Sequence, residues 1–145
     1  MTIRDWLEGL SYKLVQGSLD VEVNEVVYDS RKAAPGAVFV CMKGTKIDSH
    51  DFVGQVTDAG VKVLVTEHAV EAPADVTVVE TANGREALAL LSAARFGYPS
   101  RKLTMIGVTG TKGKTTTTHM IKTILETAGK KTGMIGTNGV YIGEE

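Results

Sequence analysis

The chain has 145 residues, of which 43% are hydrophobic and 23% are charged, and its formal net charge is −1. This composition indicates a globular protein of one domain or two small lobes, and it excludes a general attraction to nucleic acid or to an anionic membrane. No apolar run reaches the length of a membrane span, and the first residues lack a signal-peptide core. Cys41 is the single cysteine, so we expect a cytoplasmic protein without an internal disulfide and with a buried, unreactive thiol.

Strand and helix patterns alternate through the first hundred residues, which predicts a mixed α/β domain. Short runs rich in Val predict strands at 25–28, 37–42, 61–65 and 76–79. We expect a helix after Ser49, which would be its N-cap, with apolar residues on one face. A second helix is expected after Asn83, where Glu86 would complete a capping box, and its apolar residues also recur at helical spacing.

Gly97-Tyr98-Pro99-Ser100 is expected to end the second helix and marks the predicted domain boundary. Residues 1–100 would form the first domain, and residues 101–145 would begin a second one. The second segment is too short for a complete phosphate-loop domain, which stacks several parallel strands between helices. It also lacks the second, acidic strand that binds Mg²⁺ in such enzymes. We therefore expect the first βαβ unit of a truncated domain.

This βαβ unit is predicted to contain strands at 103–108 and 132–137, joined by a helix that runs to about Ala128. Five apolar residues of the helix recur along one stripe that we expect to be buried: Met120, Ile121, Ile124, Leu125 and Ala128. Asn138-Gly139 lies between apolar-rich stretches and predicts a two-residue hairpin turn.

The most informative stretch of the sequence lies between the strand at 103–108 and the helix. It reads Thr109-Gly110-Thr111-Lys112-Gly113-Lys114-Thr115-Thr116. The two glycines allow a tight turn whose N–H groups point at phosphate oxygens, and the N-terminus of a helix follows. Lys114 adds a positive charge, and the Thr115 hydroxyl is suited to Mg²⁺. The expected ligand is a nucleoside triphosphate, although Val108 stands where the common form of this loop has Gly.

Several motifs, in this order and spacing, resemble the Mur ligase family. The loop is similar to the family's ATP loop, T-G-T-N-G-K-T-[ST], with Lys112 in place of the usual Asn. Further stretches look like the family's N-terminal domain and the segment before its ATP strand: Asp29-Ser30-Arg31, residues 35–40, Lys43-Gly44, residues 48–52 and Tyr98-Pro99-Ser100. The match covers nearly the whole chain. Within the family, it is most like the ligases that add the third residue of the muramoyl peptide, and the dipeptide-adding ligases are the alternative.

The resemblance implies an ATP-dependent amide ligase that phosphorylates the terminal carboxylate of UDP-N-acetylmuramoyl-L-Ala-D-Glu, after which an amino acid amine attacks the acyl phosphate. It implies that the loop residues Gly110, Thr111, Lys112, Gly113, Lys114, Thr115 and Thr116 bind ATP. Lys114 would be catalytic by stabilising the transferring phosphoryl group, and Thr115 would hold Mg²⁺. It also implies that Ser30 contacts the uridine nucleotide, and that the uracil and diphosphate are contacted by Thr45, Lys46 and Ile47.

The proposed site residues also have structural interpretations. Ser30 would then only terminate a strand, and residues 45–47 would be an exposed loop. Trp6 and Tyr28 are expected to pack in the core, with a place beside the uracil as the alternative for Tyr28. Three histidines without metal-ligand spacing are expected to be structural or surface residues: His50, His68 and His119.

Two other functions compete with the ligase. A stand-alone nucleotide-binding module without catalysis remains open, whereas an unrelated phosphate-loop kinase or GTPase is disfavoured by Val108 and by the upstream motifs. Truncation is expected to leave this chain without ligase turnover. It is also expected to expose apolar strands, so that the chain associates with itself.

Overall fold

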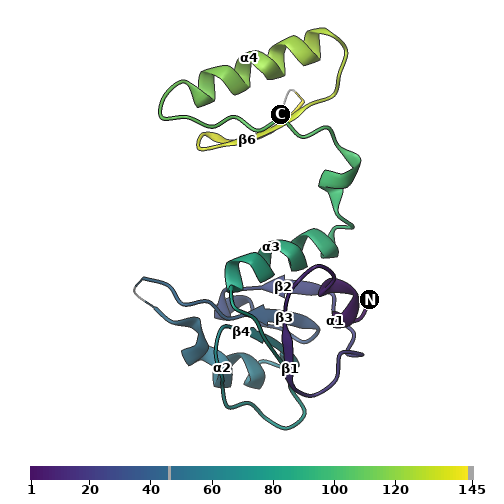
Figure 1. Ribbon diagram of the computed structural model, residues 1–145, viewed down its shortest axis with the longest axis vertical. Coiled ribbons are helices and arrows are strands. Elements are labelled where there is room, and N and C mark those ends of the chain that lie inside the picture. The colour runs from purple at the N-terminus through teal and green to yellow at the C-terminus, as the bar shows by residue number, and fades with distance from the viewer. Residues whose placement is uncertain (46, 144–145) are drawn as a thin grey trace. The chain divides into compact units, whose positions relative to one another are not determined.

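The computed structural model describes residues 1–45 and 47–143, which fall into two compact units, Met1–Leu103 and Thr104–Glu145 (Figure 1). The elements of the first unit, where η is a 3-10 helix, are α1 (Ile3–Trp6), β1 (Lys13–Gln16), β2 (Glu25–Val27), η1 (Ser30–Lys32), β3 (Ala37–Val40), η2 (Ser49–Phe52), α2 (Val53–Asp58), β4 (Val63–Thr66), β5 (Thr77–Glu80), α3 (Gly84–Arg95) and η3 (Pro99–Lys102). The second unit contains α4 (Lys114–Thr127), β6 (Gly133–Gly136) and β7 (Gly139–Ile142).

The first unit is built on a five-stranded sheet in the order β1-β5-β4-β3-β2. The four strands from β2 to β5 are parallel, and β1 pairs antiparallel with β5 at one edge. This sheet confirms the predicted mixed α/β fold class. Strands β3 and β4 are buried along their whole length, as expected for parallel strands that are covered on both faces.

Side chains of β3 alternate between two hydrophobic cores, one on each face of the sheet. Val38 and Val40 pack in the core that also contains Leu91 of α3 and residues of α1. Phe39 packs in the other core with Val56 of α2. Helices therefore cover both faces of the sheet, and the ends of the parallel strands remain accessible.

The loops that follow β2, β3, β4 and β5 all leave from the carboxyl ends of these strands. Because the strands are parallel, these ends lie along one edge of the sheet, which we call the carboxyl edge. Open α/β sheets bind ligands outside this edge. A ligand site is therefore expected among the residues that follow each strand.

Most of the elements predicted for the first unit are confirmed. All four strands are present, and Asn83 caps α3 by accepting hydrogen bonds from the backbone N–H groups of Arg85 (3.0 Å) and Glu86 (3.2 Å). The predicted cap at Ser49 is wrong, because its hydroxyl bonds the backbone of Met42 instead.

Other features of the first unit differ from the prediction or were not predicted. Trp6 is buried, as expected, but Tyr28 is 59% exposed and does not pack in the core. Strand β1 and helix α1 were not predicted from the sequence. The residues of β1 lie at an edge and are partly exposed, so they lack the continuous apolar run of the central strands.

The strand predicted at 103–108 is not formed, and the βαβ unit expected over residues 103–137 is therefore incomplete. Residues 104–113 have no helix or strand, and Met105 and Ile106 are exposed. A strand is stable only when its backbone pairs with neighbours, and the described strands of the second unit, β6 and β7, pair with each other.

The hairpin β6–β7 packs one of its faces against α4. Met134 and Tyr141 are cross-strand partners on this face, and the Tyr141 ring meets the His119 ring of α4 edge-on. The hairpin itself confirms the prediction, but its two-residue turn is Thr137-Asn138, one position earlier than expected.

The apolar stripe of α4 is not buried, contrary to the prediction. Met120 is 60% exposed and Ile124 is 65% exposed, because the hairpin covers only part of the helix surface. Across the described residues, no helix combines the length and the apolar character needed to cross a membrane.

Candidate nucleotide-binding sites

The segment that resembles an ATP loop leads directly into α4. Gly113 has φ 77°, a left-handed conformation that favours glycine, and it precedes the first helical residue, Lys114. No side chain caps this N-terminus, and the Thr117 N–H donates to the Gly113 carbonyl (2.9 Å). The three preceding amides, of residues 114–116, have no partner within the helix. They present N–H groups and the positive end of the helix dipole to an anion.

The Lys114 side chain folds back over this loop. Its ammonium donates to the Gly110 carbonyl (2.6 Å), which holds the positive charge beside the exposed helix amides. The other loop residues are all exposed: Thr111, Lys112, Thr115 and Thr116. A cradle of N–H donors, an ammonium and a threonine hydroxyl fits a polyphosphate with its magnesium ion, so the residues present match the chemistry of the implied ligand.

At the carboxyl edge of the first unit, Ser30 follows β2. The preceding Asp29 accepts a hydrogen bond from the Arg31 N–H (3.1 Å) and pairs with the Arg31 guanidinium (2.6 Å). These side-chain and backbone bonds from Arg31 lower the pKa of Asp29 to about 2. Ser30 is half-buried, and its hydroxyl has no hydrogen-bond partner among the described residues. The Asp29–Arg31 pair thus fixes the turn and leaves the Ser30 hydroxyl available.

The second group of predicted substrate contacts follows β3, the strand next to β2. Gly44 donates its N–H to the Ile47 carbonyl (2.9 Å), and Lys43 and Asp48 form an antiparallel bridge, which closes a tight turn. Thr45 is exposed and Ile47 is 63% exposed. The predicted contact at Lys46 lies outside the described residues. Neighbouring parallel strands end at the same edge, so Ser30, Thr45 and Ile47 all lie at the carboxyl edge of the sheet.

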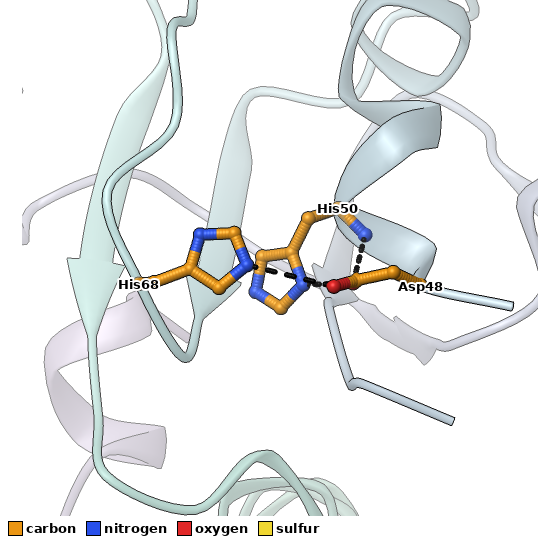
Figure 2. A group of neighbouring side chains, drawn as sticks. All are labelled: Asp48, His50 and His68. Carbon is orange, nitrogen blue, oxygen red and sulfur yellow. Dashed lines mark hydrogen bonds and ion pairs between the residues drawn. The ribbon is translucent and has the colours of Figure 1, made fainter. Parts of the chain in front are cut away.

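A cluster that was not predicted from the sequence lies at the same edge. Figure 2 shows Asp48 and His50, from the segment after β3, beside His68, from the segment after β4. The two imidazole rings stack with centroids 3.8 Å apart. His50 is buried, whereas His68 is exposed. The histidines are well separated in sequence, so only the pairing of β3 with β4 reveals this contact.

Glu67 is the second feature of this edge that sequence reasoning missed. Its carboxylate accepts hydrogen bonds from the N–H of Lys43 (2.9 Å) and from the N–H of Gly84 at the start of α3 (2.8 Å). Burial raises the pKa of Glu67, whereas these two hydrogen bonds and nearby positive charge lower it, and the net pKa is lowered. Cys41 lies nearby and is buried, as predicted, and burial raises the pKa of its thiol to about 12.

Comparison with known proteins gives two consecutive matches in one family. Residues 22–96 match the family described as "Mur ligase family, catalytic domain", and residues 108–145 match the "Mur ligase middle domain". The chain belongs to the Mur ligase family. This assignment confirms the resemblance that the sequence motifs indicated.

Curated relatives of this Mur ligase chain are diaminopimelate-adding enzymes by name. The chain is 43% identical over 145 residues to UDP-N-acetylmuramoyl-L-alanyl-D-glutamate--2,6-diaminopimelate ligase of Clostridium perfringens, covering 100% of this chain and 30% of the relative. It is 42% identical over 144 residues to the enzyme of the same name from Syntrophomonas wolfei, covering 99% of this chain and 29% of the relative. The chain therefore spans about 30% of the length of these relatives.

Solved structures that resemble this Mur ligase chain are named as MurF. A crystal structure of MurF from Acinetobacter baumannii aligns with a TM-score of 0.68 and 31% identity, covering 87% of this chain and 27% of that chain. MurF ligase from Thermotoga maritima, solved in complex with ADP, aligns with a TM-score of 0.54 and 26% identity, covering 72% of this chain and 24% of that chain.

Proposed function

We propose that this chain is part of a longer ATP-dependent ligase that adds an amino acid to UDP-N-acetylmuramoyl-L-Ala-D-Glu in peptidoglycan precursor synthesis. The observation that carries the proposal is the 43% identity along all 145 residues to a ligase of that name. The proposal places the reaction in the cytoplasm, together with ATP and the nucleotide-linked precursor.

A carboxylate is a poor electrophile, and ATP supplies the phosphoryl group that converts its oxygen into a leaving group. The γ-phosphoryl group moves to the carboxylate oxygen and ADP leaves. The amino acid nitrogen then attacks the acyl carbon, phosphate leaves, and the nitrogen loses a proton as the amide forms. Charge develops on the phosphoryl oxygens and on the leaving ADP in the transition state, so fixed positive groups accelerate this step.

In this scheme the loop from Gly110 to Thr116 holds the phosphates of ATP. Its unpaired helix amides and the Lys114 ammonium would stabilise the transferring phosphoryl group, and the Thr115 hydroxyl would hold Mg²⁺. The contact between Lys114 and the Gly110 carbonyl supports this role, because it holds the charge over the loop. Lys112, where the family usually has Asn, would contribute a second positive charge.

The first unit would bind the uridine diphosphate part of the substrate at the carboxyl edge. The Ser30 hydroxyl would contact the nucleotide, and Thr45, Lys46 and Ile47 would contact the uracil and diphosphate. The position of Ser30 and Ile47 after adjacent parallel strands supports this assignment. We assign the division at residues 100–101 to the border between this substrate domain and the ATP-binding domain.

The names of the relatives bear on which amino acid is added. The curated relatives are named for 2,6-diaminopimelate, which makes it the favoured substrate. A dipeptide-adding ligase is the second candidate, because the solved structures that align are named MurF. Their identity of 31% is lower than 43%, so we favour the amino-acid-adding reaction.

The proposal is tested by titrating the 145-residue chain with UDP-N-acetylmuramoyl-L-Ala-D-Glu in a calorimeter, without ATP. We expect saturable binding that free uridine diphosphate competes away. N-acetylmuramoyl dipeptide without the nucleotide is the control and is expected to bind far more weakly. Equal binding of the two compounds, or no heat from either at millimolar concentration, would contradict the assignment of the first unit.

A further inference from the structure

Two side chains at the carboxyl edge, His50 and Glu67, join segments that are distant in sequence. Glu67 receives the N–H of Lys43 on one carboxylate oxygen and the N–H of Gly84 on the other. The backbone N–H of Glu67 donates to His50 Nε2 (2.9 Å). Glu67, the residue that follows β4, is therefore bonded to Lys43 and His50 in the segment after β3 and to Gly84 in the first turn of α3.

The hydrogen bonds of His50 define which ring nitrogen carries the proton. Nε2 accepts from the Glu67 N–H, so it must present a lone pair. The proton is then on Nδ1, which donates to the Asp48 carboxylate (2.5 Å). The His50 side chain is only 3% exposed, so water cannot replace either partner at low cost. The ring acts as a bridge from Asp48, at the end of the turn, to the backbone of Glu67.

Asp48, His50 and His68 have the side-chain types of a metal centre, but their bonds argue against that role. Both nitrogens of His50 already have partners, so the ring has no lone pair free for a metal. Asp48 and His68 could then supply only two ligands, whereas a structural zinc site has four. The cluster is better explained as a support for the turn that precedes it.

We propose that His50 and Glu67 are positioning residues that hold Lys43 and Asp48, the two ends of the turn, so that Thr45 and Ile47 between them contact the uracil and diphosphate of the substrate. This inference rests on the proposed function of the first unit. Both ends of the turn are fixed: Lys43 to the Glu67 carboxylate, and Asp48 through the His50 ring to the Glu67 backbone. Thr45 and Ile47 remain exposed between these fixed ends.

Two substitutions of His50 separate the two ends of its bridge. In His50→Gln the side-chain amide oxygen reaches the place of Nε2 and still accepts from the Glu67 N–H. The side-chain contact with Asp48 is lost, but the backbone N–H of residue 50 still donates to Asp48, so the turn stays joined to Glu67. In His50→Asn the amide reaches only the place of Nδ1, so the contact with Asp48 is kept and the bridge to Glu67 is lost. Both variants lose the stacking on His68, which makes His50→Gln the matched control.

The test measures affinity for UDP-N-acetylmuramoyl-L-Ala-D-Glu by calorimetry and thermal stability for each full 145-residue variant. We expect His50→Asn to weaken binding by roughly tenfold, and His50→Gln to remain within about threefold of the unsubstituted chain, in line with one buried hydrogen bond. Equal affinities of the two variants would overturn the proposal, because the bridge to Glu67 would then not matter for binding.

A measurement on the unsubstituted chain covers the case in which His50→Asn does not fold. We expect saturating ligand to slow hydrogen exchange of the Glu67 amide, because binding and closure of the bridge favour each other. Unchanged exchange at Glu67 would overturn the proposal. So would a shift of the His50 ring signals by micromolar Zn²⁺, which would identify a metal centre instead.

The failure of this inference is distinguishable from failure of the proposed function. If the unsubstituted chain does not bind the UDP-linked ligand at all, the function assigned to the first unit is wrong. If it binds, and Ser30→Ala weakens binding while His50→Asn does not, the function stands and the positioning role is wrong.

Discussion

His50 holds the Asp48 carboxylate in two ways, and the His68 ring lies 3.6 Å from its other oxygen. The ring Nδ1–H and the backbone N–H (3.0 Å) of His50 both donate to the same Asp48 oxygen. These bonds favour the charged carboxylate and lower the pKa of Asp48 to about 2, against an ordinary value of about 3.9. The charge of Asp48, at the end of the binding turn, therefore contributes to the stability of the first unit.

This pKa shift predicts a loss of stability in acid. A depressed folded-state pKa stabilises the fold above the unfolded pKa, and this stabilisation disappears as the pH falls through about 4 towards about 2. Asp48→Asn keeps an acceptor oxygen but no charge, so it should be less stable at pH 7 and lose less as the pH falls from about 4.5 to about 2. Urea midpoints across this range provide the measurement. Parallel curves for the two proteins would show that the charge of Asp48 does not stabilise the fold.

The second prediction at the residue scale concerns Ser30. Its hydroxyl lies half-buried at the carboxyl edge, where the Asp29–Arg31 pair fixes the turn. Ser30→Ala should weaken binding of UDP-N-acetylmuramoyl-L-Ala-D-Glu by about 0.5–3 kcal/mol, the range for one hydrogen bond to a polar or charged group. Ser100→Ala, at an exposed serine of η3, is the control. Unchanged affinity in Ser30→Ala would remove this residue from the site.

At the scale of single elements, α3 shows how local and distant signals combine. Asn83 caps the helix through residues next to it in sequence, whereas Gly84 donates to Glu67, which is 17 residues away. Ala87 and Leu91 then bury the inner face of the helix against the sheet. Two residues thus hold the first turn of α3: the adjacent cap Asn83 and the distant Glu67, which follows β4.

The cap of α3 gives a stability prediction. Asn83 is exposed, so Asn83→Ala removes the two cap bonds without creating a cavity. The expected loss is about 1 kcal/mol of unfolding free energy, and Asn83→Ser should restore most of it because a serine hydroxyl also caps helices. Chemical denaturation of the three proteins measures both effects. Equal stability of Asn83→Ala and the unsubstituted chain would show that the first turn is held by Glu67 alone.

At the scale of the whole molecule, the two units differ in how much of their apolar surface is covered. The first unit buries two cores around its sheet. In the second, the hairpin face opposite α4 leaves Ile135 82% exposed, and Val140 and Ile142 each 63% exposed. Exposed apolar residues that gather on one open face of a hairpin favour association with another surface.

We therefore predict that the 145-residue chain associates with itself. Light scattering across a concentration series should show a rising mean mass. Ile135→Lys combined with Val140→Lys should suppress this rise, because these residues lie opposite each other on the open face of the hairpin. A matched pair of substitutions on exposed polar residues, Thr111→Lys and Thr127→Lys, controls for added charge. A monomeric mass at every concentration of the unsubstituted chain would contradict the prediction.

A second whole-molecule prediction concerns activity. The loop at Gly110–Thr116 is present, but the acidic strand expected to bind Mg²⁺ was not found in the sequence. A phosphate-release assay with ATP, UDP-N-acetylmuramoyl-L-Ala-D-Glu and diaminopimelate should read background. Release that depends on both the muramoyl peptide and the amino acid would show that these 145 residues suffice for catalysis.

The sequence alone determined the features that depend on neighbouring residues. Parallel strands buried on both faces are continuous apolar runs, so β3 and β4 were predicted from their composition. The loop from Gly110 to Thr116 is contiguous, so its glycines, lysines and threonines suffice to predict its phosphate-binding chemistry. The Asn83 cap was predicted for the same reason, since its partners follow within three residues.

Only the tertiary structure decided the features that depend on pairing across the chain. His50, His68 and Glu67 meet because β3 and β4 pair in parallel, and no spacing in the sequence indicates that contact. The apolar residues at 103–108 predicted a strand, but a strand forms only where a neighbour pairs with its backbone. The physical reason is the same in both cases: a sheet satisfies its hydrogen bonds between segments, whereas a turn or cap satisfies them within one.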